Sequence, residues 1–334
     1  MADDEDVLTE LDPILAKQDL SESPWEDGEF RPKFDVLREL LQVPIEDHKA
    51  DQQESGRVAK ALDAWIAHEL RRSGFEPGAV WPRASQPRVR PADLDPAVEA
   101  VGLALRRLSE FGDRYDKYIA AAQRKGLKKR PPSHDHGLAP AIRAIEKALP
   151  GSANANILGR FYAKQVDVVV SSWERGPDVL ISGKTQFSSY LNNKNNRYEE
   201  AVGEGKNLID RHPMAATGFA YLVRSNITAE SGALDYLKNQ LGRLKKPDGF
   251  FDATMILAAD WDDDSLEMTS VGNAADDYLT AAEFFEDLVG AVLDYAPPGV
   301  HTRVRFLRQG TPKGGLLAPD SGVNPEEAAA FDAD

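Results

Sequence analysis

Asp167 and Lys184 are the two side chains whose type and position point most directly to chemistry. Asp167 interrupts the apolar run QVDVVV, and Lys184 ends a second apolar run, DVLISGK. A carboxylate or an ammonium group in such a run is costly to bury unless a counter-charge or a metal ion compensates it. The pair therefore predicts either an ion pair that bridges two strands or a site that holds a cation.

The segment WERGP separates the two runs, and its polar, Gly-Pro composition is typical of a hairpin turn. If the turn centres between Glu174 and Arg175, Asp167 lies opposite Ser182 in an antiparallel pair. Side chains alternate between the two faces of a strand, so Ser182 and Lys184 share the face of Asp167. We expect Asp167 and Lys184 to project together from neighbouring strands.

The hairpin resembles the core of the PD-(D/E)xK nucleases, the fold of most type II restriction endonucleases. In that family an Asp opens one strand and an acid-x-Lys motif lies on the next, as Asp167 and Lys184 do here, 17 positions apart. Ser182 replaces the second acid. One branch, which includes enzymes that read CCGG-type sites, has Ser-x-Lys there and a glutamate on the following helix. The resemblance covers about residues 140–260 and implies Glu199 or Glu200 as that glutamate.

The family resemblance implies Mg²⁺-dependent hydrolysis of phosphodiester bonds in double-stranded DNA. Asp167 with Glu199 or Glu200 would hold Mg²⁺, and Lys184 would orient or help to deprotonate the attacking water. The chain has no cysteine, which agrees with oxygen ligands and a hard cation. A duplex presents two antiparallel scissile strands, so we expect a homodimer that cuts at a specific sequence.

The elements around the hairpin follow an α/β pattern. Amphipathic helices are expected at about 57–72, 96–124, 138–149, 195–210, 230–245 and 277–295. Strands rich in β-branched residues are expected at about 161–172, 178–186, 216–225 and 252–261. This order predicts a mixed β-sheet flanked by helices, and the resemblance makes it a restriction-endonuclease-like core. The expected domains are a mainly helical region at 1–135, a nuclease core at 136–311 and an acidic tail at 312–334.

The charge distribution favours a polyanionic partner. The whole chain carries a net charge of −15, but residues 55–150 carry +7 and residues 151–250 carry +3. Basic segments in the centre of an acidic chain are typical of contacts with phosphates. The residues expected to contact DNA are Arg83, Arg88, Arg90, Lys128, Lys129, Arg130, Lys194, Asn195, Asn196 and Arg197.

Other features allow competing hypotheses. Pro177-Asp178 with Glu204-Gly205-Lys206 has the literal letters of the nuclease motif, but two helical residues two apart point to different sides. The string SGKT at 182–185 resembles the end of a phosphate-binding loop, which lacks its first glycine here. His134-Asp135-His136 has no evident third metal ligand. A nuclease-fold protein that binds DNA without cutting, or acts in defence, and a nuclease specific for modified or branched DNA also remain as alternatives.

The sequence predicts a cytoplasmic protein without a membrane partner. No apolar run approaches the length of about 18 residues that a membrane span requires. The acidic start MADDEDVLTE lacks the basic and apolar regions of a secretory signal.

Overall fold

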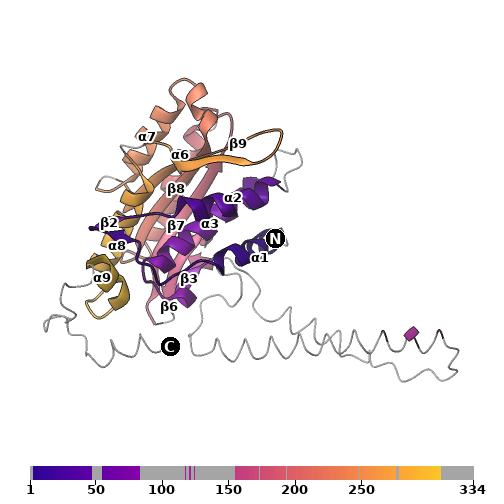
Figure 1. The fold of residues 1–334 in the computed structure, drawn as a ribbon. Helices are drawn as coiled ribbons and strands as arrows, with labels where there is room; N and C mark the ends of the chain where they lie inside the picture. Colours follow the sequence, from indigo (N-terminus) through magenta and orange to yellow (C-terminus); the bar gives the residue numbers. More distant parts are fainter. Residues whose placement is uncertain are drawn as a thin grey trace. The chain divides into compact units, whose positions relative to one another are not determined.

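The computed structural model describes residues 3–46, 55–82, 155–172, 174–192, 194–247, 249–275 and 278–309, together with four isolated positions between 117 and 124. The chain divides into one unit of residues 1–84 and 154–334 and a second unit of residues 85–153. The expected boundary at 135/136 falls inside the second unit, and the expected tail lies outside the described residues. The first unit, drawn as ribbons in Figure 1, is described below.

Six strands form the central sheet, in the order β10-β9-β8-β7-β6-β3. Strands β7, β8 and β9 are parallel, and the other neighbours are antiparallel, so the sheet is mixed. Two small antiparallel pairs, β1-β2 and β4-β5, lie outside it. The strands are β1 (Trp25–Glu26), β2 (Glu29–Phe30), β3 (Val80–Trp81), β4 (Ala155–Leu158), β5 (Ala163–Val166), β6 (Val168–Ser172), β7 (Gly176–Gln186), β8 (Ala216–Arg224), β9 (Ala253–Trp261) and β10 (Met268–Asn273).

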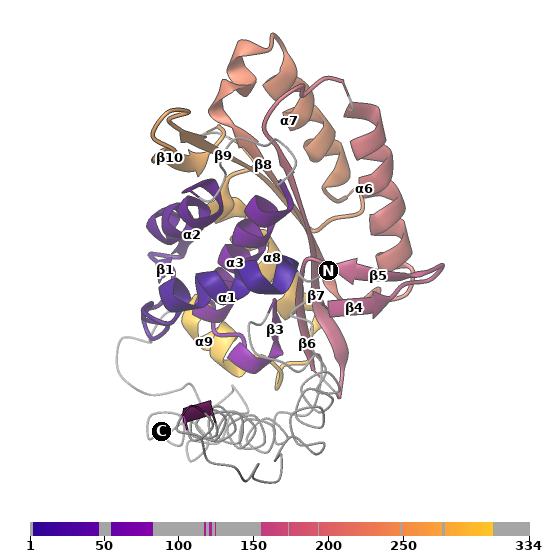
Figure 2. The ribbon, with the colours of Figure 1, turned by 90° about the vertical axis from the view of Figure 1, so that its right-hand side faces the viewer.

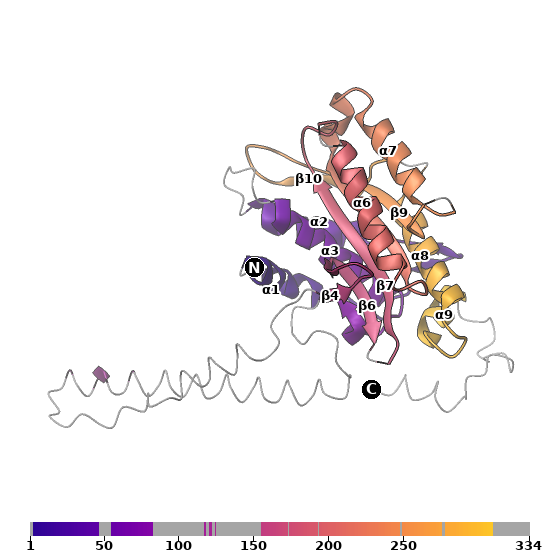
Figure 3. The same cartoon turned by 180° about the vertical axis from the view of Figure 1, so that it is seen from behind.

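Helices cover both faces of the sheet (Figures 2 and 3). On one face α3 packs on β6 and β7, α8 on β8 and β9, and α2 on β10, while α6 and α7 lie on the other face. The helices are α1 (Asp3–Leu15), α2 (Phe34–Glu46), α3 (Ser55–Arg72), α6 (Lys194–Ile209), α7 (Ala233–Leu244), α8 (Ala281–Tyr295) and α9 (Thr302–Gln309), with short 3-10 turns η1 (Pro77–Ala79) and η3 (Ser225–Ala229).

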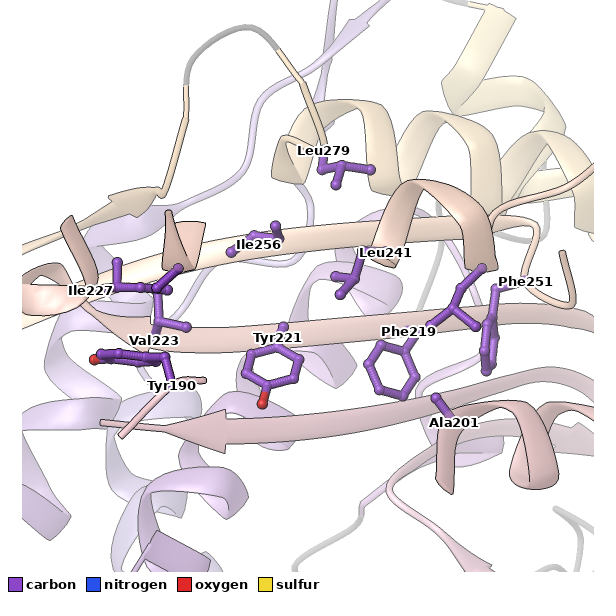
Figure 4. Packing of buried hydrophobic residues seen from close by; sticks show 12 residues of the cluster. Tyr190, Ala201, Phe219, Tyr221, Val223, Ile227, Leu241, Phe251, Ile256 and Leu279 are labelled. Carbon is purple, nitrogen blue, oxygen red and sulfur yellow. The ribbon is translucent and has the colours of Figure 1, made fainter. Parts of the chain in front are cut away.

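The central strands are apolar along their length because both faces are covered. Every residue of β8 except the last, Arg224, is buried. On the side of α6 and α7, the β8 side chains Phe219, Tyr221 and Val223 pack with Leu241 and Phe251 in one hydrophobic cluster (Figure 4). Burial of each large apolar side chain contributes about 1.5–3 kcal/mol to the stability of the fold. This cluster is therefore one of the main interactions that hold α6 and α7 on the sheet.

The helix α3 is buried on more than one side. Leu62, Trp65 and Ile66, whose spacing puts them on one face of the helix expected at about 57–72, are buried. The helix α3 packs against the sheet on one side and against α1 and α2 on others, so His68 and Glu69 are also buried. A helix between two layers can therefore hold polar residues close to the sheet.

The helices expected near 195–210, 230–245 and 277–295 are confirmed as α6, α7 and α8. The two-residue strand β3, the strand β10 and the helix α9 were not predicted. In the described part of the chain, no helix has both the length and the apolar composition needed to cross a membrane.

Gly218 in β8 gives a test of the packing between the sheet and α8. A Cβ atom at this position would lie 2.8 Å from Cζ of Phe284, inside the buried core. We expect Gly218→Ala to destabilise the fold by about 1–3 kcal/mol, because the crowded core must shift. Gly272→Ala is the control, since a Cβ there has open space. Denaturant unfolding measures both, and equal stabilities of the two variants would contradict this packing.

Candidate active site

Asp167 lies where the chain leaves β5, which pairs with β4, and enters β6, which pairs with β7. Val168 is paired with Ile181, so Asp167 lies opposite Ser182 as expected, although a register shift between Val170 and Ser171 moves the turn centre to Glu174. Oδ2 of Asp167 accepts a hydrogen bond of 2.9 Å from the Gly183 amide. The half-buried Asp167 carboxylate thus accepts a main-chain hydrogen bond of β7 that a carbonyl of a paired strand would otherwise accept. This bond holds the carboxylate against β7.

The strand β7 presents Ser182 and Lys184 on the side of α6. The Ser182 hydroxyl is buried and donates a hydrogen bond to Glu204 of α6. Nζ of Lys184 lies 4.0 Å from Oε2 of the same glutamate, and the lysine side chain keeps 23% of its surface exposed. The alternation expected for β7 therefore brings the hydroxyl and the ammonium group to one carboxylate.

Glu204 is the acidic residue of α6 that reaches this site. It is 2% exposed, and its Oε2 lies 2.6 Å from Nζ of Lys164 on β5. Ala201, Glu204, Gly205 and Leu208 are all buried, at the i, i+3, i+4 and i+7 spacing of an inward helix face. The glutamate therefore lies in the buried stripe of α6, and two lysines and a hydroxyl compensate its charge.

Asp63 of α3 approaches the site from the opposite face of the sheet. It is 1% exposed and its Oδ2 lies 3.2 Å from Nζ of Lys60, one turn earlier. A Cβ atom at Gly183 would lie 2.9 Å from Oδ1 of Asp63, so the glycine leaves room for the carboxylate. Oδ1 is buried and has no hydrogen-bond partner. An unsatisfied carboxylate oxygen in the core is costly, which marks this position as unusual.

The environment of Asp63 opposes its ionisation. Burial, and then the negative charge of Asp167, raise the pKa of Asp63 to about 7. The positive charges of Lys60 and Lys184 act in the other direction but are smaller effects. Near neutral pH this carboxyl therefore exchanges readily between its acid and its carboxylate form.

Burial also raises the pKa of Asp167 above its ordinary value. Lys60, the Gly183 amide and Lys184 lower it, while Glu204 raises it. Asp167 thus interacts with Asp63 on the α3 side and with Glu204 on the α6 side. Three carboxylates and the amines of Lys60, Lys164 and Lys184 form one nearly neutral cluster, which we call the carboxylate–lysine cluster.

Glu199 and Glu200, the expected metal ligands, lie elsewhere on α6. Both are exposed, and Glu200 forms an ion pair of 3.0 Å with Arg197. No hydrogen bond or ion pair joins either glutamate to Asp167 or Lys184 in the described residues. The first turns of α6 face solvent, and the helix face that turns towards β7 carries Glu204 instead.

The expected DNA-contacting residues divide into two groups. Asn195, Asn196 and Arg197 are exposed at the start of α6, where the side chain of Lys194 is not described. The remaining six, in the two basic loops, lie outside the described residues: Arg83, Arg88, Arg90, Lys128, Lys129 and Arg130.

The geometry also bears on the competing motifs. Asp178 pairs with Arg175 and His301, and Lys206 is exposed and pairs with Asp210, so the alternative register does not assemble around Glu204. Residues 182–185 lie within the extended strand β7, where no phosphate-binding loop forms. The His134-Asp135-His136 segment lies outside the described residues.

Sequence reasoning missed Asp63, Lys60 and Lys164. Asp63 lies three residues before Ile66, inside the apolar stripe of α3, so it carried the same signal as Asp167: an acid where an apolar residue is expected. Lys164 alternates with exposed neighbours on β5 and carried no such signal.

No protein-family model, curated protein or solved structure matches this chain. Across the described residues, no group of three or more His, Asp or Glu side chains is already arranged to hold a metal ion. In the carboxylate–lysine cluster, Asp63 and Glu204 are paired with lysines and Asp167 with the Gly183 amide.

The raised pKa of Asp63 predicts how stability depends on pH. A carboxyl whose folded pKa is raised stabilises the fold when protonated, and this contribution is lost as pH rises from about 4 through about 7. Asp63→Asn cannot ionise, so its stability relative to the wild type should rise by on the order of 2 kcal/mol between pH 5 and pH 8.5. Asp235→Asn, at an exposed position of α7, is the control and should show no such trend. Urea unfolding at both pH values measures it, and a pH-independent difference for Asp63→Asn would refute the assignment.

Proposed function

We propose that this protein is a Mg²⁺-dependent endonuclease that hydrolyses phosphodiester bonds in double-stranded DNA, most similar to the type II restriction enzymes of the PD-(D/E)xK superfamily. The observation that carries the proposal is the convergence of Asp167, Lys184 and Glu204 at one end of the β6–β7 pair. An acid that opens one strand, a Ser-x-Lys on the next and a glutamate on the following helix make up the family pattern. Glu204 takes the role that the resemblance gave to Glu199 or Glu200, although it comes 20 residues after Lys184, beyond the spacing of some 13 to 16 residues in the family branch.

The donor chemistry of the cluster fits a hard divalent cation. Asp63, Asp167 and Glu204 offer only carboxylate oxygens, and the unpartnered Oδ1 of Asp63 lacks the positive charge that such an ion brings. Asp167, which interacts with both of the other acids, and Glu204 would hold the ion, and Asp63 would face Asp167 from the α3 side. Mg²⁺ in this place would polarise the phosphate and lower the pKa of a bound water.

The chain's own residues would then position and neutralise the reacting groups. Lys184, whose side chain is partly exposed, would orient the attacking water and offset the negative charge that grows on the phosphate. Ser182 and Lys164 would hold the Glu204 carboxylate in place through the contacts that they already make. Water adds to phosphorus, one ester P–O bond breaks, and a phosphate monoester and a free hydroxyl remain.

A homodimer that cuts at a specific sequence follows from this proposal. One active site per chain cuts both strands of a duplex most simply when a two-fold axis relates two copies. The amides and Arg197 at the exposed start of α6 are suited to contact DNA, since Asn and Arg pair with adenine and guanine edges. A DNA-binding protein of the same fold that does not cut is the second candidate, because the lysines already neutralise the acidic residues.

Lys184 gives the first test of catalysis. We expect the wild type to cut unmethylated phage DNA into discrete fragments with Mg²⁺ and not with EDTA. Lys184→Ala should lower the cleavage rate by about 10²- to 10⁴-fold, because an oriented proton-transfer group is lost. Lys17→Ala, which removes an exposed lysine next to α1, should cut like the wild type. Cleavage by Lys184→Ala at the wild-type rate would refute the assignment.

Glu204 and Glu200 give a second, independent test. Glu204→Gln should abolish both cleavage and the rise in melting temperature that Mg²⁺ causes, since a ligand that binds the folded state stabilises it. Glu200→Gln should keep both, because Glu200 is exposed and paired with Arg197. The melting temperature without metal reports whether Glu204→Gln still folds. If Glu200→Gln were the variant that loses the Mg²⁺ response, the acid inferred from the family pattern would be right and Glu204 structural.

A further inference from the structure

The turn between β4 and β5 exposes three large apolar side chains next to the carboxylate–lysine cluster. Leu158 is 57% exposed, Phe161 66% and Tyr162 52%, and we call residues 158–162 the hairpin tip. Single apolar residues on a surface are common, but three within five residues form a local patch that water solvates poorly. Such a patch is typical of a contact site.

The backbone of the hairpin tip is rigidly held by one buried residue. Asn207 of α6 is fully buried, and its Oδ1 accepts hydrogen bonds from the amides of Phe161, at 2.8 Å, and Tyr162, at 3.3 Å. Its Nδ2 donates to the Tyr162 carbonyl at 3.2 Å, and its own carbonyl accepts from the Arg160 amide at 2.8 Å. The exposed side chains are therefore presented from a fixed turn and do not hang from a loose loop.

Gly159 allows this close approach. A Cβ atom at this position would lie 2.1 Å from Nδ2 of Asn207, a distance at which the turn and the helix could not both keep their places. The backbone of the tip thus packs so tightly against α6 that position 159 must be glycine, whereas the large apolar side chains of the tip make little contact with the protein. That combination indicates a surface shaped for an external partner.

The charges around the hairpin tip favour a polyanion. Arg160 is 59% exposed, lies with its guanidinium 5.5 Å from the centre of the Phe161 ring, and pairs with Asp210. Lys206 pairs with the same aspartate, and Arg211 follows it as an exposed residue. Two cations, Arg160 and Lys206, pair with one carboxylate here, and Arg211 adjoins it in sequence, on a chain whose net charge is −15.

We propose that the hairpin tip contacts the DNA substrate directly, with Phe161 and Tyr162 stacking on bases and Arg160 binding a backbone phosphate. This inference rests on the proposed function, which supplies the DNA. Aromatic rings stack on bases without regard to sequence, and apolar side chains that enter a base step unstack and kink the duplex. The tip is also joined to the site: Lys164 of β5 holds Glu204, and Asn207 follows Glu204 by one helical turn.

The test compares variants of the full-length protein on DNA that cannot be cut. Duplexes of 30 base pairs in mixed sequence, each with one 2-aminopurine, are titrated with protein in Ca²⁺ without Mg²⁺. We expect the double variant Phe161→Ala/Tyr162→Ala to bind about 10- to 100-fold more weakly and to lose the change in 2-aminopurine fluorescence, because stacking is removed. Phe161→Trp, which keeps an aromatic ring at this position, should retain both the affinity and the fluorescence change. Phe306→Ala, an exposed aromatic residue on α9, is the control and should bind like the wild type.

The outcomes separate this inference from the proposed function. Binding that the double variant retains would refute the role of the tip and leave the nuclease proposal intact. Tip-dependent binding by a wild type that never cuts DNA would support the tip and refute the nuclease. A wild type that binds no DNA would overturn both. Light scattering on the same samples identifies the remaining case: a dimer that the double variant converts to a monomer would make the tip an interface between copies, against the proposal.

Discussion

Mutual compensation of buried charge is the interaction on which the arrangement of α3, β5, β7 and α6 depends. A single uncompensated ion in this interior would lower the stability of the fold by several kcal/mol. Removal of one partner from a buried pair has this effect, because the other charge stays buried without compensation. Asp63, Asp167 and Glu204 each reach the cluster from a different element, and each is met by a lysine or a backbone amide. The elements must keep their relative positions for the charges to remain balanced.

Local chemistry determined what the sequence could predict. The alternation of QVDVVV and DVLISGK and the polar segment between them predicted that β6 pairs with β7 and that Asp167 lies opposite Ser182, without knowledge of distant residues. The register shift between Val170 and Ser171 has no signal in that alternation. The apolar periodicity of α3, α6 and α8 likewise predicted those helices. By contrast, β3 has only two residues and β10 alternates little, so neither carries a pattern that a reader of sequence can recognise.

Tertiary placement determined what the sequence could not predict. Glu199, Glu200 and Glu204 all lie on one predicted helix, and which of them faces β7 depends on how that helix is rotated against the sheet. The burial of Ala201 and Leu208 settles its rotation, and that burial is a property of the packed sheet. Asp63 arrives from a helix about 100 residues earlier in the chain, so no local spacing relates it to Asp167.

Asn207 fixes the main chain of the hairpin turn but not its side chains. Its side chain and carbonyl recognise only main-chain groups of residues 160–162, so the path of the turn does not depend on which side chains those residues carry. Exposed positions of this kind accept substitutions with little loss of stability. Single mutations can therefore change the chemistry of this turn one position at a time, while α6 keeps Glu204 where it is. In natural or engineered variants, the exposed side chains of the hairpin can therefore change without disturbing the rest of the fold.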